Sequence, residues 1–430
     1  MTNNAALLAP IELPFFNQFY LGRQPILNRA QRLVAYELLF RHAHCDGADV
    51  IDGMEATATV IAHASELGME QVVGQQLAYV NVDTATLMSD FIRFLPCKQV
   101  ILEILESVRA TPDVLARVRE LRQLGFKFAL DDVVGPSDEV DKLGPLVDVI
   151  KVDIQHLSRP ALAALVHVLK GTGTTLLAEK VETPEQFEHC LQLGFEYFQG
   201  YYFARPVILS GKKIAPSELA ILHLLELIGA EAETSEIERC IKHDALLSLN
   251  LLRLVNTPAV GARMRIDTIG QALLVLGRRQ LQRWLQILLY VRPGDSSQQF
   301  TSPLLQMATT RGKLLELITI KLRPGQRKCA DIGFTIGIMS LMDALFSIQM
   351  PDILDSVRVL DKVREALLFR DGYYGNMLAL VEHVERADPD MDLGPRLREL
   401  ALSAADLNTI QLAAFEWVNE YVQGVSQTRH

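Results

Sequence analysis

The sequence lacks the features of several protein classes. Its five cysteines are scattered and form no Cys-x-x-Cys pair, which argues against a zinc knuckle or a disulfide framework and predicts reduced thiols in a cytoplasmic protein. The N-terminus has no basic-then-apolar signal peptide. The longest apolar run, 332–348, contains Asp343 and is too short to predict a membrane span. Acidic residues outnumber Lys and Arg by 52 to 42, so no direct binding of nucleic acid is expected.

The length and composition predict two soluble domains. A chain of 430 residues with 49% hydrophobic side chains has enough apolar material for more than one core. Strand and helix patterns alternate over residues 19–207, whereas residues 208–430 show only the apolar spacing of helices. We therefore expect an N-terminal arm (1–18), an α/β domain (19–207) and an all-α domain (208–430).

Polar residues end almost every apolar strand of the α/β domain. In an open sheet the ligand site lies at one switch point, whereas a barrel gathers all its strand ends in a ring. The repeated polar ends therefore favour a TIM-like α/β barrel, with one antiparallel strand because the first two strands have a short connection. The residues at these strand ends are Glu37, Asn81, Glu103, Asp131 with Asp132, Lys151, Glu179 and Gln199.

The chemistry of this ring predicts a site for hard cations. Adjacent carboxylates such as Asp131 and Asp132 repel each other unless a cation or proton separates them, although a strand ending in an acidic turn is the simpler alternative. Carboxylate and amide oxygens without histidine or cysteine suit Mg²⁺, Mn²⁺ or Ca²⁺. Lys151 offers a point charge to an anionic oxygen, and Arg41 offers a fork for phosphate. Together they would suit attack of water on a phosphodiester.

Several motifs of the first half, taken in order, resemble the EAL domains of bacterial cyclic di-GMP phosphodiesterases. Glu37-Leu38-Leu39-Phe40-Arg41 resembles the Glu-Ala-Leu-Leu-Arg signature, and Asp131-Asp132 resembles the family's Asp-Asp-Phe-Gly. Gln24-Pro25-Ile26, Lys151-Val152-Asp153 and Gln199-Gly200-Tyr201 are similar to further family strands.

The resemblance implies a role for each matching residue. It implies that Lys151 orients water or the scissile phosphate and that Glu179 is the general base. Metal ligands would be Glu37, Asn81, Glu103, Asp131 and Asp132. Substrate would be bound by Gln24, Arg41 and Gln199, with support from Glu106, Asp153 and Glu182.

The chain also departs from the family pattern around these residues. Val133-Val134 replaces Phe-Gly after the aspartates, and Pro136-Ser137-Asp138-Glu139 replaces a loop that couples dimerisation to metal binding in active members. Lys180 replaces a glycine beside Glu179, and its ammonium would compete with a divalent cation. A degenerate site with weak or lost hydrolysis is therefore expected.

The second half resembles the HDOD domain, a relative of HD phosphohydrolases without their metal ligands. The similar segments are 241–247, 252–256 and 269–277, and Ser340-Leu341 stands where HD enzymes would show His-Asp. His243-Asp244 is either a metal-binding pair or the start of a helix capped by Asp244, and the lack of further nearby histidines favours the cap. Arg278, Arg279 and Arg283 with Trp284 form either a docking patch or a solvated helix face.

Two functions follow from the resemblance. The first is a cytoplasmic signalling protein whose degenerate EAL domain binds, or formerly hydrolysed, cyclic di-GMP and whose HDOD domain docks a protein partner. The alternative is an active Mg²⁺- or Mn²⁺-dependent phosphodiesterase that gives linear pGpG. Bound metal is expected in the active case and is left open in the degenerate one, as is a homodimer.

Overall fold

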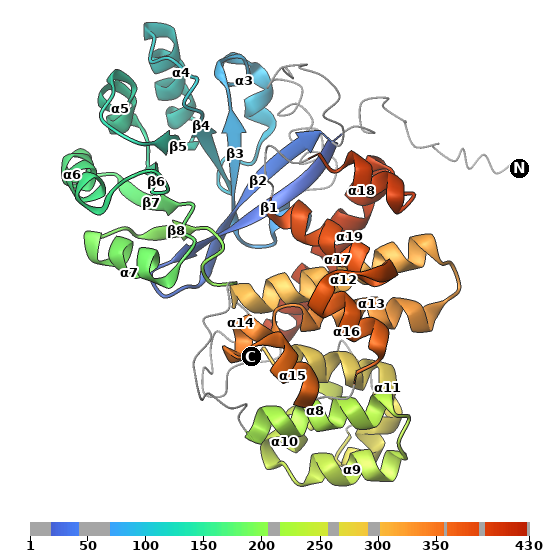
Figure 1. Cartoon of the computed structure of the whole chain (residues 1–430). Helices are drawn as coiled ribbons and strands as arrows, with labels where there is room; N and C mark the ends of the chain where they lie inside the picture. Colours follow the sequence, from blue (N-terminus) through green and yellow to red (C-terminus); the bar gives the residue numbers. More distant parts are fainter. Residues whose placement is uncertain are drawn as a thin grey trace, which may run out of the picture.

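The computed structural model contains a β/α barrel followed by a helical domain (Figure 1). The structure describes residues 19–42, 69–204, 216–256, 266–290, 302–356, 359–386 and 392–427. The predicted N-terminal arm (1–18) and the predicted domain boundary at residue 207 lie outside these residues.

The barrel closes with its eight strands in chain order. The first strand is antiparallel to both of its neighbours, and every other neighbouring pair is parallel. The connection between the first two strands is only four residues long, which suits a hairpin and is too short for a parallel crossover. The α/β TIM-like barrel with one antiparallel strand is confirmed. The strands are β1 (Phe19–Asn28), β2 (Leu33–His42), β3 (Leu77–Val82), β4 (Val100–Ile104), β5 (Lys127–Val133), β6 (Val149–Asp153), β7 (Thr175–Glu179) and β8 (Tyr197–Gln199).

Apolar side chains fill the barrel on both faces of the strands. Alternate strand residues point inward and outward, so each strand contributes side chains to an inner core and to an outer core beneath the helices. Outward-facing residues such as Leu102, Phe128 and Ile150 pack against the surrounding helices. The inner core contains Ile26, Ala35, Tyr79, Ile101, Ala129, Val149 and Leu177.

The longer helices around the barrel begin with side-chain caps. Thr111 and Ser158 each accept a hydrogen bond from the third residue of the helix that follows, and Thr183 forms a full capping box with Gln186. These caps fix where each helix leaves the loop above a strand end. The described helices are α2 (Met69–Val73), α3 (Thr84–Met88), α4 (Pro112–Gln123), α5 (Asp138–Leu143), α6 (Arg159–Leu169) and α7 (Pro184–Leu193).

The described residues after 215 form helices without strands, as expected for an all-α domain. Gly277 has φ +72° and interrupts α11 with a kink. Helix α13 ends at Met339 and a new helix starts at Met342. These helices are α8 (Pro216–Gly229), α9 (Thr234–Lys242), α10 (Ala245–Val255), α11 (Ile269–Leu288), α12 (Pro303–Leu322), α13 (Arg327–Met339), α14 (Met342–Phe346), α15 (Met350–Ser356), α16 (Asp361–Phe369), α17 (Gly372–Arg386), α18 (Gly394–Glu399) and α19 (Ala404–Gln427).

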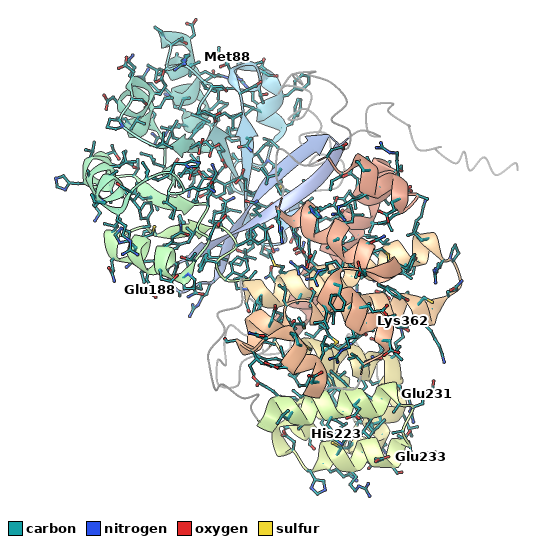
Figure 2. All side chains as sticks on the ribbon, in the orientation of Figure 1. Met88, Glu188, His223, Glu231, Glu233 and Lys362 are labelled. Atoms are coloured by element: carbon teal, nitrogen blue, oxygen red, sulfur yellow. The ribbon has the colours of Figure 1, made fainter. Side chains whose placement is uncertain are left out.

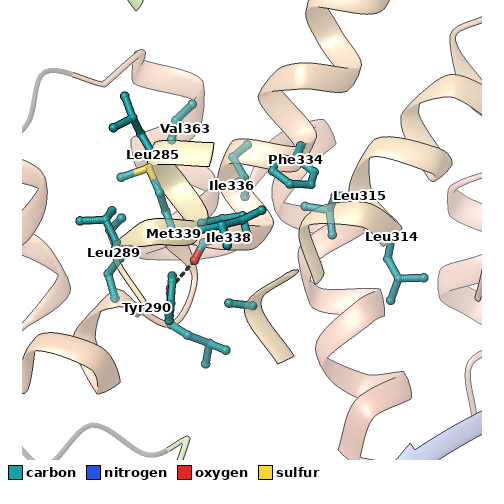
Figure 3. Close-up of a cluster of buried hydrophobic side chains, with 14 of the residues drawn as sticks. Leu285, Leu289, Tyr290, Leu314, Leu315, Phe334, Ile336, Ile338, Met339 and Val363 are labelled. Atoms are coloured by element: carbon teal, nitrogen blue, oxygen red, sulfur yellow. Dashed lines mark hydrogen bonds between the residues drawn. The ribbon is translucent and has the colours of Figure 1, made fainter. Parts of the chain in front are cut away.

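The helical domain has a continuous apolar core around α11, α12 and α13 (Figure 3). Within it, the buried Tyr290 hydroxyl donates a hydrogen bond to the carbonyl of Ile338, which satisfies both polar groups. A Cβ at Gly337 would lie 2.4 Å from the backbone nitrogen of Gly312, so only glycine permits this approach of α12 and α13. The stretch Arg327–Phe346 is long and apolar enough to cross a membrane, but 61% of its most apolar window is buried in the protein, as in a core helix.

Many charged side chains lie on the outside of both domains. The labelled side chains Glu188, His223, Glu231 and Lys362 all lie at the surface in Figure 2 and are exposed. Basic residues of α11 are instead used internally: Arg279 and Arg283 form ion pairs with Glu316, and Trp284 is buried. Of the docking patch considered for this helix, Arg278 is exposed, whereas Arg279, Arg283 and Trp284 are engaged within the helical domain.

The helical domain covers the outer edge of the hairpin β1–β2 (Figure 1). Within the described part of the chain, β1 pairs with β8 through Ile26–Asn28 alone, so the earlier part of β1 has an edge without a described strand partner. Two side chains of α19 form hydrogen bonds with the backbone of Leu21 on this edge. Leu21 N donates to Asn408 Oδ1 over 2.9 Å, and Gln411 Nε2 donates to Leu21 O over 2.6 Å. The helical domain thus contacts the same strand that carries Gln24.

Candidate functional site

The candidate site lies inside the barrel, at the carboxyl ends of its parallel strands. The strand register places the side chains of the site at the same height along the barrel axis. Asn81 is the backbone partner of Glu103, and Asp153 is that of Glu179. Glu37 on β2 faces Gln24 on β1 in the antiparallel pair. Because inward-facing side chains of neighbouring strands gather in layers, these polar groups converge above the inner apolar core.

Lys151 lies at the centre of this cluster. Its ammonium Nζ is 3.2 Å from Glu37 Oε2, 3.1 Å from Asp131 Oδ1 and 2.7 Å from Glu179 Oε1. It also forms an ion pair with Glu103. The lysine side chain is only 1% exposed, so four carboxylates from four strands share one buried cation. The structure thus brings together these five residues that sequence reasoning placed in one ring.

The excess of negative charge sets the protonation of the cluster. Burial alone would lower the pKa of Lys151, but the surrounding carboxylates raise it well above its usual value. Burial raises the pKa of Glu103 strongly, with a further contribution from the charges of Asp131 and Glu37. Burial also raises the pKa of Glu179, to about 8. Near neutral pH, protons on these glutamates therefore offset part of the charge that one lysine leaves uncompensated.

Asp131 has the opposite behaviour. Burial opposes its ionisation, but Lys151 and hydrogen bonds from its neighbours lower its pKa below the ordinary value. The raised pKa of Glu103 and the lowered pKa of Asp131 thus favour a proton on the glutamate and a negative charge on the aspartate. Such a pair titrates as a unit.

Amide side chains complete the cluster on the side of β1. Gln199 Nε2 donates to Glu37 Oε2 over 2.6 Å and to Gln24 Oε1 over 2.8 Å. Asn81 Nδ2 lies 3.3 Å from Glu37 Oε1. Glu37 is therefore held by the amides of Asn81 and Gln199 as well as by Lys151, and all three are predicted site residues.

Asp132 is separated from its neighbour Asp131. Strand pairing is irregular between Leu130 and Val133, and Asp132 has φ +50°, so the two aspartates serve different clusters. Asp132 Oδ1 lies 3.3 Å from Lys180 Nζ, and the same ammonium forms an ion pair with Asp153. Both carboxylates raise the pKa of Lys180, although partial burial opposes them.

Lys180 itself stands in a strained backbone conformation. Its φ of +55° lies in the left-handed region, which glycine adopts without steric cost and other residues rarely adopt. The ion pairs with Asp132 and Asp153 hold the lysine there. The effect of Lys180 on metal binding stays a prediction, but its contacts are with these outer aspartates rather than with the central carboxylates.

The residues present fit a divalent cation. Oxygens of Glu37, Glu103 and Glu179 lie within 4.8 Å of one another, and all three residues are buried. Within the described part of the chain, Glu103 Oε2 and Gln199 Oε1 are buried without a hydrogen-bond donor. An all-oxygen donor set with unsatisfied acceptors suits a hard cation such as Mg²⁺, Mn²⁺ or Ca²⁺.

The remaining predicted residues lie further out or are not placed. Glu106 is exposed in the turn after β4, and no contact described here links it to the central cluster. The backbone N–H of Glu182 donates to Gln186 at the start of α7, so Glu182 belongs to the helix entry. The side chain of Arg41 lies outside the described residues. The structural role of these three residues in the site stays a prediction.

Among the described residues, Glu37, Glu103 and Glu179 of the barrel form a group that could hold a metal ion, and the helical domain contains no such group. Asp244 caps α10, because its Oδ1 accepts a hydrogen bond from Leu247 N over 2.9 Å. Ser340, where HD enzymes would show a ligand, accepts from Arg311, which is held by Glu385. The capping interpretation of His243-Asp244 is confirmed.

Sequence reasoning missed two residues that reach the site region from the helical domain. The carbonyl of Arg386, at the end of α17, accepts a hydrogen bond from Gln24 Nε2 over 3.0 Å. Phe415 of α19 lies 3.8 Å from the guanidinium of Arg23. Neither contact has a local sequence signal, because each joins positions more than 350 residues apart.

Comparison with known proteins agrees with this architecture. The EAL domain family matches residues 16–206, and the HDOD domain family matches residues 219–341. The uncharacterized protein YuxH of Bacillus subtilis is 30% identical over 409 residues, which cover 93% of this chain and 97% of YuxH. The cyclic di-GMP phosphodiesterase CdgJ of Vibrio cholerae is 30% identical over 374 residues, which cover 86% of this chain and 85% of CdgJ.

Solved structures give a weaker match. The crystal structure of the Bacillus subtilis YkuI protein, which has an EAL domain and contains c-di-GMP and calcium, is 20% identical and has a TM-score of 0.37, covering 63% of this chain and 74% of that one. That score is too low to support a conclusion. The two relatives that match over most of their length carry the assignment: the chain belongs to the family of proteins in which an EAL domain is followed by an HDOD domain.

Proposed function

We propose that this chain is a cytoplasmic signalling protein whose barrel binds cyclic di-GMP together with a divalent cation and hydrolyses it slowly or not at all. The observation that supports this function best is the convergence of Glu37, Glu103 and Glu179, with Asp131, on a buried Lys151. The relative CdgJ, similar over most of this chain, is a cyclic di-GMP phosphodiesterase. A cyclic dinucleotide carries two phosphodiesters, which suit a site of hard cations and amides.

The chain's own residues have distinct roles in this proposal. Glu37, Asn81, Glu103 and Asp131 would hold the cation, and Asp132 would contribute to a second one. Mg²⁺ or Mn²⁺ bound there would neutralise these carboxylates and polarise a phosphodiester oxygen. Burial raises the pKa of Glu179 to about 8 in the absence of metal. A cation bound beside it would favour the ionised form, which would accept a proton from water. Lys151 would orient the anionic oxygen, and Gln24, Gln199 and Arg41 would bind the dinucleotide.

Lys180 is the reason to expect slow hydrolysis. Its ammonium contacts both Asp132 and Asp153, the carboxylates next to the central cluster. A second cation at Asp132 would have to displace this ammonium and would be repelled by it. The expected result is a site that keeps one cation and its ligand but lacks the second charge that the reaction needs.

An active phosphodiesterase that gives linear pGpG is the second candidate. It is favoured by one observation: the ammonium of Lys180 contacts Asp132 and Asp153 and not the carboxylates around Lys151. In this case Lys180, whose side chain is 48% exposed, would swing into solvent when metal binds.

One experiment separates these functions. The full chain is mixed with cyclic di-GMP and Mn²⁺, binding is followed by calorimetry, and the product is followed by chromatography. We expect saturable, metal-dependent binding with little pGpG. Glu103→Gln should abolish binding, whereas Glu188→Gln, at an exposed glutamate of α7, should not. The absence of saturable binding would refute the proposed function, and rapid turnover would replace it with the second candidate.

The helical domain is proposed to dock a protein partner rather than to catalyse. The support is the capping role of Asp244 and the presence of Ser340 where an HD enzyme would need a ligand. A pull-down with the full chain and with a variant carrying charged substitutions at the exposed Leu274 and Val275 tests this role. Loss of a specific partner only in the variant supports it, and equal recovery of that partner would contradict docking at this surface.

A further inference from the structure

A chain of side-chain hydrogen bonds connects the helical domain to the centre of the candidate site. It begins at the carbonyl oxygen of Arg386, the last residue of α17, which accepts from Gln24 Nε2 over 3.0 Å. Gln24 Oε1 accepts in turn from Gln199 Nε2 over 2.8 Å. The same Gln199 nitrogen donates to Glu37 Oε2 over 2.6 Å. Glu37 contacts Lys151, the hub of the carboxylate cluster.

The direction of each bond in this chain is fixed by its two ends. A backbone carbonyl can only accept, so the nitrogen of the Gln24 amide must face Arg386 and its oxygen must face Gln199. Glu37 accepts from the other side when it is ionised, so Gln199 must present its nitrogen to both partners. The Gln199 oxygen is then left buried without a donor and available to a ligand. Docking of α17 therefore determines how the amide of Gln24, a half-exposed side chain, is oriented.

Other contacts hold the ends of this chain in place. Tyr201, two residues after Gln199, lines an interdomain cavity with Val384 and Glu385 of α17. On the opposite side of Gln24, the guanidinium of Arg23 lies between the rings of Tyr36 and Phe415. The helical domain thus packs against β1, which carries Gln24, and against the segment that follows β8, the strand that carries Gln199.

We propose that the docked helical domain positions Gln24, and through it Gln199 and Glu37, so that the domain interface tunes cation and dinucleotide binding in the barrel. Gln24 acts as a positioning residue that transmits the state of the interface. This inference rests on the proposed function for its ligands, but its geometry is independent of turnover. Separation of the domains, for example by a partner of the helical domain, would loosen Glu37 without touching it.

The test is a double-mutant cycle in the full chain. Asn408→Ala with Gln411→Ala removes the two side chains that dock α19 on Leu21, and neither lies in the candidate site. We expect this pair to weaken Mn²⁺ binding about three- to ten-fold, the loss typical of one hydrogen bond. Gln24→Ala should have a similar effect, and adding the pair to Gln24→Ala should weaken binding no further. Asp355→Ala, which breaks an exposed ion pair of the helical domain, is the matched control and should leave Mn²⁺ binding unchanged.

A second readout does not depend on metal or ligand. The side-chain amide signals of Gln24 and Gln199 are followed by NMR in glutamine-labelled protein, and both should shift when Asn408 and Gln411 are replaced. If that pair fails to fold, as judged by circular dichroism, Phe415→Leu is used to loosen the interface. Additive losses in the cycle, or unshifted Gln199 signals after undocking, would overturn the inference. The wild type could bind neither Mn²⁺ nor cyclic di-GMP while replacement of Asn408 and Gln411 still shifts both signals. That result would support the positioning role of Gln24 and refute the proposed function alone.

Discussion

Replacement of Lys180 by glycine is the most informative single change in this protein. The substitution removes the ammonium that contacts Asp132 and Asp153. It also places glycine at a backbone φ of +55°, a conformation that glycine adopts at no steric cost. The two effects act on different properties: the first on cation binding and the second on stability.

The magnitude follows from the exposure of the ion pairs. The Lys180 side chain is 48% exposed, so solvent screens both of its ion pairs. The pair with Asp132, which is 38% exposed, is worth at most about 1 kcal/mol, and the pair with the buried Asp153 is worth about 1 kcal/mol. A cation entering next to Asp132 must break two such pairs, at a cost of about 1–2 kcal/mol. Lys180→Gly should therefore tighten binding of the second cation about five- to thirty-fold. Relief of left-handed strain, about 1 kcal/mol, should offset the stability lost with the ion pairs.

The assay is Mn²⁺ titration of cyclic di-GMP hydrolysis, with calorimetry of Mn²⁺ alone. Lys180→Gly should lower the Mn²⁺ concentration needed for half-maximal rate and raise the rate itself. Lys180→Met, which keeps the side-chain bulk and the backbone strain but not the charge, should recover the cation effect and not the stability. If Lys180→Gly and Lys180→Met both bind Mn²⁺ as the wild type does, the electrostatic argument is wrong.

Three further predictions concern other residues. Lys151→Met removes the single buried cation shared by four carboxylates. It should destabilise the metal-free protein by about 3–5 kcal/mol in urea unfolding, and low pH should recover part of this stability. An unchanged unfolding midpoint would contradict the central role of Lys151. Because burial raises the pKa of Glu179 to about 8, above its unfolded value, the metal-free fold retains protons that the unfolded chain has lost. The melting temperature without metal should thus fall as pH rises from 6 to 8.5, and excess Mn²⁺ should reduce this fall; a rise without metal would contradict the assigned shift. Asp244→Ala should cost about 1 kcal/mol through loss of the α10 cap without changing bound metal, and loss of a metal ion would restore the HD interpretation.

The polar ring could be predicted from the sequence because each strand ends on a chemical group that its position explains. Parallel strands of a barrel place their carboxyl ends together, so Glu37, Glu103 and Glu179 had to converge once the fold was right. The role of Lys151 was harder to predict. Its contact with four carboxylates depends on strand register and side-chain length, which a motif does not encode.

Features that depend on backbone irregularity or distant contacts could not be predicted. Adjacent Asp131 and Asp132 were expected to share a metal site, but the irregular pairing of β5 and the left-handed Asp132 send the second aspartate to Lys180. The short helices α3 and α5 have only five or six residues, too few for apolar periodicity to show. The bond from Gln24 to Arg386 joins two domains across 362 positions, and only tertiary packing creates it.

The two lysines give the barrel a way to remain folded without a cation. A pocket built for two hard cations carries carboxylates that would repel one another once the cations leave. Here Lys151 and the raised pKa values of Glu103 and Glu179 balance the inner cluster, and Lys180 balances Asp132 with Asp153. The inner balance depends on protons that a cation can replace, whereas the outer balance depends on a permanent charge. Cation binding should therefore be reversible at Glu37, Glu103 and Asp131 and opposed at Asp132, and the inner group is the one that Gln24 connects to the helical domain.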